Sequence, residues 1–471
     1  MGISLFAFIR ILFCFSFSFA QSNTHHDPII VSSKKTHNLR LLNEGTVAFN
    51  QILSTISFAK KTIDLEYFIF KTDVAGKLIV HELIKSAKKG VKIRVLLDHS
   101  SFFIKLNDLF AIRLKNYGIE IKYFNRSTPI TPDDFLWRNH RKLIVADGSI
   151  AILGGRNIGD EYFDHGTGYN FLDRDLVIEG PIVTEIRKSF DIFWNSPFAT
   201  RPNDRWYLNE NVNGWSRLRA IHLKIDEFFQ MDKASLARLK THRLIGLPIL
   251  SKTPSYQCKE VLFATDSPNI PKKTKVHNIF RKLLQKTTNE LIIETPYLIL
   301  KDDISNDILD YLKRDGHLSI LTNGLYSTDI GITYAALLKR IREPIKKGAQ
   351  IYVYGGSPPK QPIVSTSAQN GIWGIHAKTI VFDRRHTMIG TFNIDPRSES
   401  YNMELTLVCL NNEDLANDTI KDIDERIKYS GQLDEEGHPL DHRYPYSKTP
   451  FYIRAGLLIF SPFVRYFDDY L

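Results

Sequence analysis

The sequence predicts an α/β protein made of two tandem halves of similar design. The chain has 471 residues, more than a usual single domain, and its 43% hydrophobic and 24% charged residues are typical of a folded globular protein. Short apolar runs alternate with amphipathic stretches of helical length, a pattern typical of a buried, mostly parallel sheet. The same order of elements occurs twice, so we expect two tandem α/β repeats packed as a pseudo-two-fold pair.

The periodicity places three helices and three strands in corresponding positions of each half. The first half is expected to have helices near 44–58, 75–89 and 105–117 and strands at 63–70, 91–97 and 119–124. The second is expected to have helices at 276–287, 303–314 and 330–347 and strands at 291–300, 318–321 and 351–354. These assignments give a first half at 21–200, a connector at 201–257 with a basic helical stretch near 216–242, a second half at 258–430, and a tail at 431–471.

Residues 1–20 are predicted to be a secretory signal peptide. Arg10 is followed by a mostly apolar run that ends in Ser18-Phe19-Ala20, with small residues where a signal peptidase needs them. An uncleaved anchor is the alternative, because 18 residues can nearly span a bilayer. Bulky residues before Cys14 argue against a lipoprotein signal. We therefore expect an exported protein, located in the periplasm or at the outer face of the inner membrane, or secreted.

Cysteine usage and charge narrow the class of protein further. Outside the signal region the chain has Cys258 and Cys409, and the strand-like run before Cys409 favours a buried structural thiol. A Cys258–Cys409 disulfide is the alternative in an oxidising compartment. The net charge of +10 favours anionic partners, either nucleic acid or acidic lipid headgroups, without choosing between them.

One constellation of polar residues occurs once in each half with identical spacing. The first copy comprises His140, Lys142, Asp147, Gly154, Gly155 and Asn157. The second, 236 residues later, comprises His376, Lys378, Asp383, Gly390, Thr391 and Asn393. A histidine and a lysine two apart on a strand point to the same face. Two copies facing each other would place two imidazoles, two ammoniums and two amides around one point.

This arrangement suits reactions at a phosphodiester. Lysine and asparagine can stabilise charge on the non-bridging oxygens while one histidine attacks phosphorus. The other histidine can protonate the leaving alcohol and then deprotonate the incoming one. The sequence has no phosphate-binding loop of the GxxxxGK[ST] or GxGxxG type, and no HExxH or paired CxxC metal motif. No cofactor and no metal are expected.

Carboxylates near the motifs are candidates to orient the imidazoles. Glu404, 28 residues after His376, stands at the head of an apolar strand and could fix the tautomer of a histidine. Aligning this strand with its counterpart pairs Asp175 with Glu404, and Asp173 with Asn402. The aspartates that close the motifs, Asp147 and Asp383, should lie on the opposite face of their strands and are expected to be structural.

These motifs resemble those of the phospholipase D superfamily, whose hallmark is two such copies, over most of residues 40–410. The words that flank them look like those of bacterial cardiolipin synthases of the C type; they occupy residues 65–70, 154–163, 171–175, 390–398 and 402–404. The resemblance implies two phospholipase D-like repeats and a metal-independent, two-step exchange through a phosphohistidine. It also implies that His140 is the nucleophile and that a phosphatidyl group moves onto phosphatidylglycerol or a related acceptor.

The chain departs from the superfamily pattern at Gly155 and Thr391, where a serine is common, so the half-sites are expected to differ. We expect Gly155, Thr391, Tyr67 and Tyr297 to contact substrate, with the loop at 128–137 helping to exclude water. His165, His438 and His442 are expected to be solvated.

An anionic phospholipid and a membrane surface are the expected partners; nucleic acid is disfavoured and no protein partner is predicted. The apolar tail could lie in a headgroup interface or pack on the body of the protein. A cleavable signal keeps a secreted phospholipase D hydrolase open, and the net charge keeps a nuclease of the same superfamily as a third alternative.

Overall fold

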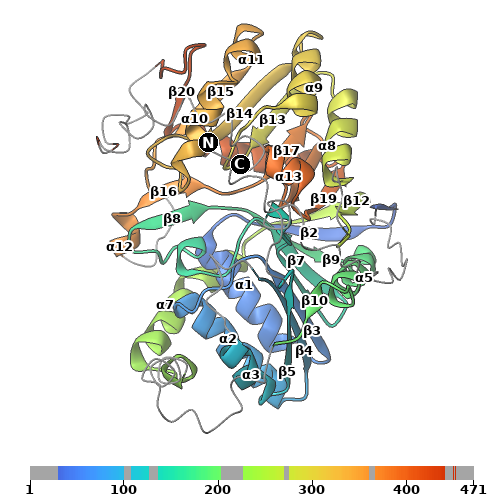
Figure 1. Cartoon of the computed structure of the whole chain (residues 1–471), viewed down its shortest axis with the longest axis vertical. Coiled ribbons are helices and arrows are strands. Elements are labelled where there is room, and N and C mark those ends of the chain that lie inside the picture. Colours follow the sequence, from blue (N-terminus) through green and yellow to red (C-terminus); the bar gives the residue numbers. More distant parts are fainter. Residues whose placement is uncertain are drawn as a thin grey trace, which may run out of the picture.

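The computed structural model describes residues 30–99, 108–126, 136–202, 226–269, 275–359, 366–440, 449 and 451. It consists of two α/β halves stacked on each other, each built on a nine-stranded sheet (Figure 1). The predicted α/β class and the duplication are confirmed. The predicted signal peptide and nearly all of the apolar tail lie outside the described residues. Within the described residues, no helix is both long and apolar enough to cross a membrane.

The first sheet has the strand order β10-β5-β4-β3-β6-β7-β9-β2-β11. Its strands are β2 (His37–Leu42), β3 (Thr62–Tyr67), β4 (Lys92–Asp98), β5 (Ile119–Phe124), β6 (Leu143–Ala146), β7 (Ile150–Gly154), β9 (Asp175–Glu179), β10 (Ala199–Thr200) and β11 (Ser255–Cys258). The helices of this half are α1 (Gly45–Phe58), α2 (Val74–Lys88), α3 (Asp108–Lys115) and α5 (Ile182–Trp194). Apolar side chains of α1, α2 and α3 cover one face of the sheet, and those of α5 cover the other, which explains why β3 and β4 are mostly buried on both faces.

The second sheet repeats this plan in the order β1-β12-β19-β18-β17-β13-β14-β15-β20. Its strands are β1 (Ile30–Ser33), β12 (Glu260–Thr265), β13 (Glu290–Glu294), β14 (His317–Asn323), β15 (Gln350–Tyr354), β17 (Thr379–Phe382), β18 (His386–Gly390), β19 (Leu405–Leu410) and β20 (Ser430–Gln432). Its helices are α8 (Lys275–Lys286), α9 (Asp302–Leu312), α10 (Gly331–Leu338), α11 (Arg342–Lys346), α12 (Thr366–Gln369), α13 (Pro396–Ser400) and α14 (Glu413–Ile427). The single helix expected at 330–347 is two helices, because Pro344 cannot donate to the Arg340 carbonyl and its ring would clash with it.

The halves exchange strands at their junction. β1, expected in the first half, pairs with β12 of the second sheet, whereas β11, mostly in the predicted connector, pairs with β2 of the first. The segment boundaries predicted from the sequence therefore do not coincide with the boundaries of the sheets. The buried core between the sheets contains Cys258 and Cys409, which form a disulfide with a Cα–Cα distance of 5.9 Å. The expectation of a free thiol is wrong, because the pairing of β12 with β19 brings the end of β11 beside Cys409.

The predicted connector contributes a helix. A third sheet, of two strands, lies between the halves. Helix α7 (Lys233–Leu250) begins later than the predicted helical stretch and packs against α1, where Gly246 approaches Asn50 too closely for any side chain. Asp232 caps it by accepting the N–H of Ser235 at 2.7 Å. Between the halves, β8 (Tyr169–Leu172) pairs in parallel with β16 (Ile372–Ile375), and this pairing adjoins the candidate site (Figure 1).

Candidate active site

The two motifs meet at the interface between the halves. His140 and Lys142 lie in extended chain just before β6, and His376 and Lys378 lie just before β17. All four side chains are buried, and each lysine is near enough for its charge to act on the imidazole of the other half. The structure thus brings the two predicted clusters together as one site.

Each imidazole contacts a carboxylate from the opposite half of the chain. The Nδ1 atom of His140 lies 3.0 Å from both carboxylate oxygens of Glu404. The Nδ1 atom of His376 lies 2.5 Å from Oδ2 of Asp173. Both contacts leave Nε2, the atom that can react with phosphorus or exchange a proton, free of these carboxylates.

Backbone pairing across the interface produces this exchange of carboxylates. The His140 N–H donates to the Met403 carbonyl at 3.1 Å, which places Glu404 beside that histidine. In the other half-site the pairing of β8 with β16 ends with the His376 N–H donating to the Leu172 carbonyl at 2.7 Å. Asp173 therefore comes next to His376. A strand alignment within one half cannot show this contact.

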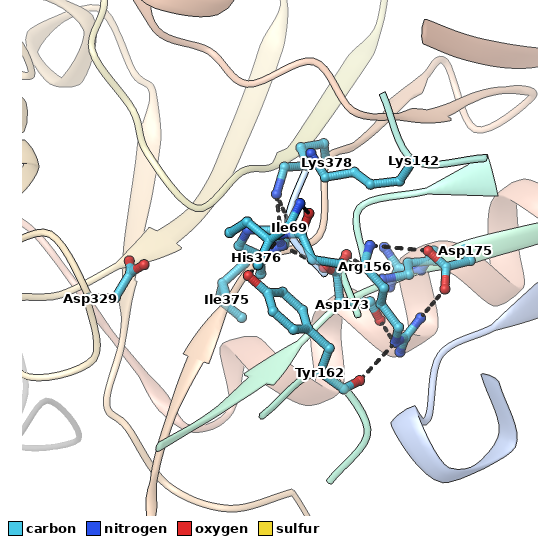
Figure 2. A network of polar contacts seen from close by, with 12 residues as sticks. Ile69, Lys142, Arg156, Tyr162, Asp173, Asp175, Asp329, Ile375, His376 and Lys378 are labelled. Carbon is cyan, nitrogen blue, oxygen red and sulfur yellow. Dashed lines mark hydrogen bonds and ion pairs between the residues drawn. The ribbon is translucent and has the colours of Figure 1, made fainter. Parts of the chain in front are cut away.

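The predicted orienting role of Asp175 is wrong. Its carboxylate accepts hydrogen bonds from the Arg156 guanidinium at 3.0 Å and from the Arg156 backbone at 3.2 Å. The reason is that Asp175 is the first residue of β9, inside the first sheet, whereas Asp173 precedes that strand and faces the other half. Figure 2 shows the Arg156–Asp175 pair on one side of Asp173 and His376 on the other.

Asp147 and Asp383 have the structural role expected of them. Asp147 accepts the backbone N–H groups of Lys60, Lys61 and Thr62 at 2.7–2.9 Å. Asp383 accepts the N–H groups at the start of β13 in the same manner, from residues 288–290. Partial burial opposes ionisation of both groups, but these hydrogen bonds outweigh it and lower the pKa of each. Each aspartate therefore ties its motif strand to the neighbouring antiparallel strand, β3 or β13.

The two lysines keep their ammoniums in the site. Lys142 Nζ donates to the His140 carbonyl at 2.6 Å, and Lys378 Nζ donates to the His376 carbonyl and lies 2.9 Å from its Nδ1. Burial lowers the pKa of Lys378 to about 8 and that of Lys142 well below its usual range. Both Nζ atoms are thus held in a buried site, where a bound anion would favour their protonated form.

Electrostatics differ between the two imidazole–carboxylate pairs. Burial, followed by the charge of the nearby lysines, lowers the pKa of His140 well below 6.5 and that of His376 to about 3. Burial raises the pKa of Glu404 to about 7, although Lys142 opposes the shift. For Asp173 burial acts in the same direction, but His376 and Lys378 outweigh it and lower its pKa below the usual range. Asp173 is thus an anion, whereas Glu404 is close to half-protonated at neutral pH.

Comparison with known proteins agrees with this geometry. The profile described as "Cardiolipin synthase, PLD-like domain" matches residues 52–194 and 280–427, more than half of the chain. The chain belongs to this phospholipase D-like family. It is accordingly an enzyme that transfers phosphodiester groups of phospholipids.

This chain is similar to several known sequences and to a solved structure. Cardiolipin synthase C of Escherichia coli is 25% identical over 388 residues, 78% of this chain and 80% of the relative. An uncharacterised protein of Helicobacter pylori strain J99 is 30% identical over 383 residues, 77% of this chain and 74% of the relative. The crystal structure of phosphatidylserine synthase from Haemophilus influenzae aligns with a TM-score of 0.63 at 15% identity, covering 92% and 95% of the two chains. The last comparison shows a shared fold.

Gly155 and Thr391 act on the carboxylates of this phospholipase D-like site. A Cβ atom on Gly155 would lie 2.1 Å from Oδ1 of Asp173, so only glycine leaves room for that side chain. The Thr391 hydroxyl donates to Glu404 and accepts the Leu405 N–H at 3.0 Å. The structure therefore gives both residues a place behind the imidazole-binding carboxylates, and contact with substrate stays a prediction for each.

The remaining predicted residues have unequal positions. Asn157 accepts the Ile69 N–H at 3.2 Å and donates to the Tyr162 hydroxyl at 2.9 Å; Asn393 is buried in the equivalent position. Tyr67 is packed in the core of the first half, which contradicts its expected contact with substrate. Tyr297 is half-buried and donates its hydroxyl to Asp329 at 2.9 Å. Of the loop at 128–137, which is expected to help exclude water, residues 128–135 lie outside the described residues.

Sequence reasoning missed the aromatic side chains that hold the imidazoles. Phe68 lies edge-on to His140 with ring centroids 5.1 Å apart, and Tyr162 and Phe171 lie 5.2 and 4.7 Å from the ring of His376. All three lie in the short sequences that flank the motifs (residues 65–70, 154–163 and 171–175), and this position could have indicated them. His165, expected to be solvated, is buried, and burial lowers its pKa to about 4. Within the described residues no group of three or more His, Cys, Asp or Glu side chains could hold a metal ion.

Proposed function

We propose that this enzyme is a phosphatidyltransferase that forms cardiolipin, moving a phosphatidyl group of a glycerophospholipid onto phosphatidylglycerol through a phosphohistidine on His140. The observation that carries the proposal is the pair of buried imidazoles, each held at Nδ1 by a carboxylate of the opposite half. The names of the relatives, cardiolipin synthase C and phosphatidylserine synthase, support lipid substrates over nucleic acid.

In the first step Nε2 of His140 attacks phosphorus. This histidine is neutral because its pKa is lowered, so its lone pair is available without prior loss of a proton. The P–N bond forms while the bond to the leaving alcohol breaks. The alcohol oxygen takes a proton from Nε2 of His376, and the anionic Asp173 then stabilises that imidazole in its correct tautomer.

Substrate binding makes His376 a usable acid. The pKa of this histidine is about 3, chiefly because of burial and the neighbouring Lys378. A bound phosphodiester adds a negative charge beside both, which favours the protonated imidazole. The ammoniums of Lys142 and Lys378 and the amides of Asn157 and Asn393 surround the position of the non-bridging oxygens, where charge increases in the transition state.

In the second step the acceptor alcohol reverses these events. His376 removes the proton of the acceptor hydroxyl, the new P–O bond forms, and the P–N bond to His140 breaks. Water can take the place of the acceptor, and the product is then phosphatidic acid. Transfer therefore requires a site that favours the lipid alcohol over water.

Product analysis tests the proposal directly. Purified enzyme is incubated with phosphatidylglycerol vesicles, and the lipids are identified by mass, with and without a strong chelator. We expect more cardiolipin than phosphatidic acid. We also expect no effect of the chelator, because lysine and asparagine, and not a metal ion, stabilise the charge on the phosphate. Predominant phosphatidic acid with acceptor lipid in excess would instead indicate the hydrolase. Loss of turnover on chelation, restored by one divalent ion, would contradict the metal-independent site.

We also propose that the enzyme works outside the cytoplasm at a membrane surface. The disulfide between Cys258 and Cys409 supports this location, since disulfides persist in oxidising compartments. The mass of the mature protein should correspond to a chain that begins after Ala20. A mature chain that begins at Met1 or Gly2 would favour the uncleaved anchor.

A further inference from the structure

A cavity of about 520 Å³ adjoins the His376 half-site. Tyr162 and Phe171 connect it to His376, since both rings line the cavity and both pack on that imidazole. Residues of the first half line most of the rest, Arg238 of α7 and Asp329 of the second half complete the lining, and Asp329 is exposed at the open side. Its volume lies in the range of small-ligand pockets, about 300 to 1,000 Å³. The cavity thus borders the residue to which the mechanism assigns the alcohol's proton.

The cations of this cavity are already paired with carboxylates. Lys71 forms an ion pair with Glu161, and Arg238 lies 3.5 Å from Asp160. His165, which also lines the cavity, adds no charge at neutral pH because burial lowers its pKa to about 4. Among these described lining residues, no unpaired cation is therefore available to bind a second phosphate group.

Asp329 is the lining carboxylate that has no cationic partner within the described residues. It belongs to the second half, accepts the Tyr297 hydroxyl at 2.9 Å and 3.1 Å from its two oxygens, and retains further lone pairs. It is close enough for its charge to act on Tyr162 and Lys378. Figure 2 shows it across from Tyr162 and His376. Its free acceptor capacity suits a ligand that donates hydrogen bonds.

We propose that this cavity is the acceptor-alcohol subsite and that it selects an uncharged polyol end group, with Asp329 as the specificity residue. The assignment rests on the proposed transferase function. One hydroxyl of the polyol donates its proton to Nε2 of His376 as its oxygen bonds to phosphorus and the P–N bond to His140 breaks. A second hydroxyl donates a hydrogen bond to Asp329. Water cannot span both groups, so the polyol intercepts the phosphohistidine in preference to water.

The test measures how the intermediate divides between a polyol and water. Full-length enzyme is incubated with phosphatidylglycerol vesicles and isotope-labelled glycerol, and labelled phosphatidylglycerol is compared with phosphatidic acid. Asp329→Ala should lower this transfer-to-hydrolysis ratio about tenfold, the effect expected for loss of one hydrogen bond to a charged group. Asp329→Asn keeps an acceptor oxygen and should lower it less. Asp310→Asn, an exposed carboxylate on α9, is the matched control and should leave the ratio unchanged.

The outcomes separate this inference from the function on which it rests. An unchanged ratio in both Asp329 variants, while the wild type still incorporates glycerol, overturns the subsite alone. A parallel assay with labelled ethanolamine distinguishes the ligand class: if Asn is as harmful as Ala and only ethanolamine incorporation falls, the cavity binds an ammonium and the polyol assignment is wrong. A wild type that makes only phosphatidic acid overturns both the transferase and the subsite.

Discussion

The two half-sites have the same plan but different electrostatics. In one, His140 contacts Glu404, whose pKa is raised to about 7 and which accepts a hydrogen bond from Thr391. In the other, His376 contacts Asp173, whose pKa is held below its usual range by His376 and Lys378 although burial opposes this shift. A duplicated fold thus supplies two imidazoles in unlike environments. The mechanism that we propose needs this difference, because in it one histidine attacks as a neutral base while the other is stabilised as a cation.

The positions behind the carboxylates explain how the difference is maintained. Gly155 leaves room for Asp173, whereas Thr391 at the equivalent position donates to Glu404. Glu404 reaches His140 with a longer side chain than that of Asp173, and its carboxylate also accepts a hydrogen bond from the Thr391 hydroxyl. The departure from the common Gly-Ser pattern therefore belongs to the specialisation of the two half-sites.

Removing either imidazole should have the largest effect. His140→Asn and His376→Asn should each lower turnover by about 10³-fold or more, since neither half can complete the reaction alone. A substrate whose leaving group needs no acid, the p-nitrophenyl ester of phosphatidic acid, distinguishes their roles. With it, His376→Asn should accumulate a phosphoryl adduct on His140, detected by peptide mass. An adduct on His376 in the His140 variant would reverse the assignment.

Neutralising the two carboxylates should have unequal effects. Asp173→Asn removes an anion that stabilises the imidazolium form of His376 and should lower kcat by about 10³-fold. Glu404→Gln should lower it only about tenfold, because that carboxylate is already close to half-protonated at neutral pH. Steady-state kinetics on both variants check the prediction. Equal losses would mean that the two pairs are electrostatically alike.

Substitutions at Gly155 and Thr391, the residues behind the carboxylates, should have an intermediate effect on activity. Gly155→Ser forces Asp173 to move, because even a Cβ atom would lie 2.1 Å from its oxygen, and a displacement of about 1 Å can cost about 10²-fold in rate. Thr391→Ser keeps the hydroxyl on Glu404 and should retain most of the activity. Thermal unfolding of both variants shows whether lost activity reflects lost folding. Full activity of Gly155→Ser would contradict the close contact.

The smallest expected effect is on the pH dependence of stability. The pKa of Glu404 is raised from 4.5 to about 7 in the folded state, so the folded protein binds more protons than the unfolded chain between these values. Its contribution to stability is therefore present below pH 4.5 and is lost as the pH rises to about 7. Asp98 and Asp266, with pKa values raised to about 7 by burial, act in the same direction.

Denaturant unfolding between pH 5 and 7 measures this contribution. Glu404→Gln should reduce the slope of the unfolding free energy against pH, by at most about 1.4 kcal/mol per pH unit, the value for one proton. Glu343→Gln, an exposed glutamate on α11, is the control and should leave the slope unchanged. A slope that Glu404→Gln does not alter would show that Glu404 is ionised throughout this range.

The duplicated α/β plan and the residues of the two motifs could be predicted from the amino-acid sequence. Local rules suffice for this, because alternating apolar runs define strands and helices, and a repeat with identical spacing shows which polar residues belong together. The same rules identified Asp147 and Asp383 as structural, although each lies in the turn just past its strand, with a positive φ, and not on the opposite strand face that was expected.

Which carboxylate serves which histidine depends on how the two halves pack against each other. Asp173 and Glu404 reach the imidazoles of the opposite half because strand pairing across the interface brings Leu172 beside His376 and Met403 beside His140. The Cys258–Cys409 disulfide depends in the same way on the pairing of strands from different halves. These contacts join residues 151 to 264 positions apart. Periodicity and spacing describe a chain only over the length of one element, so the packing of the two halves had to be known before these partners could be assigned.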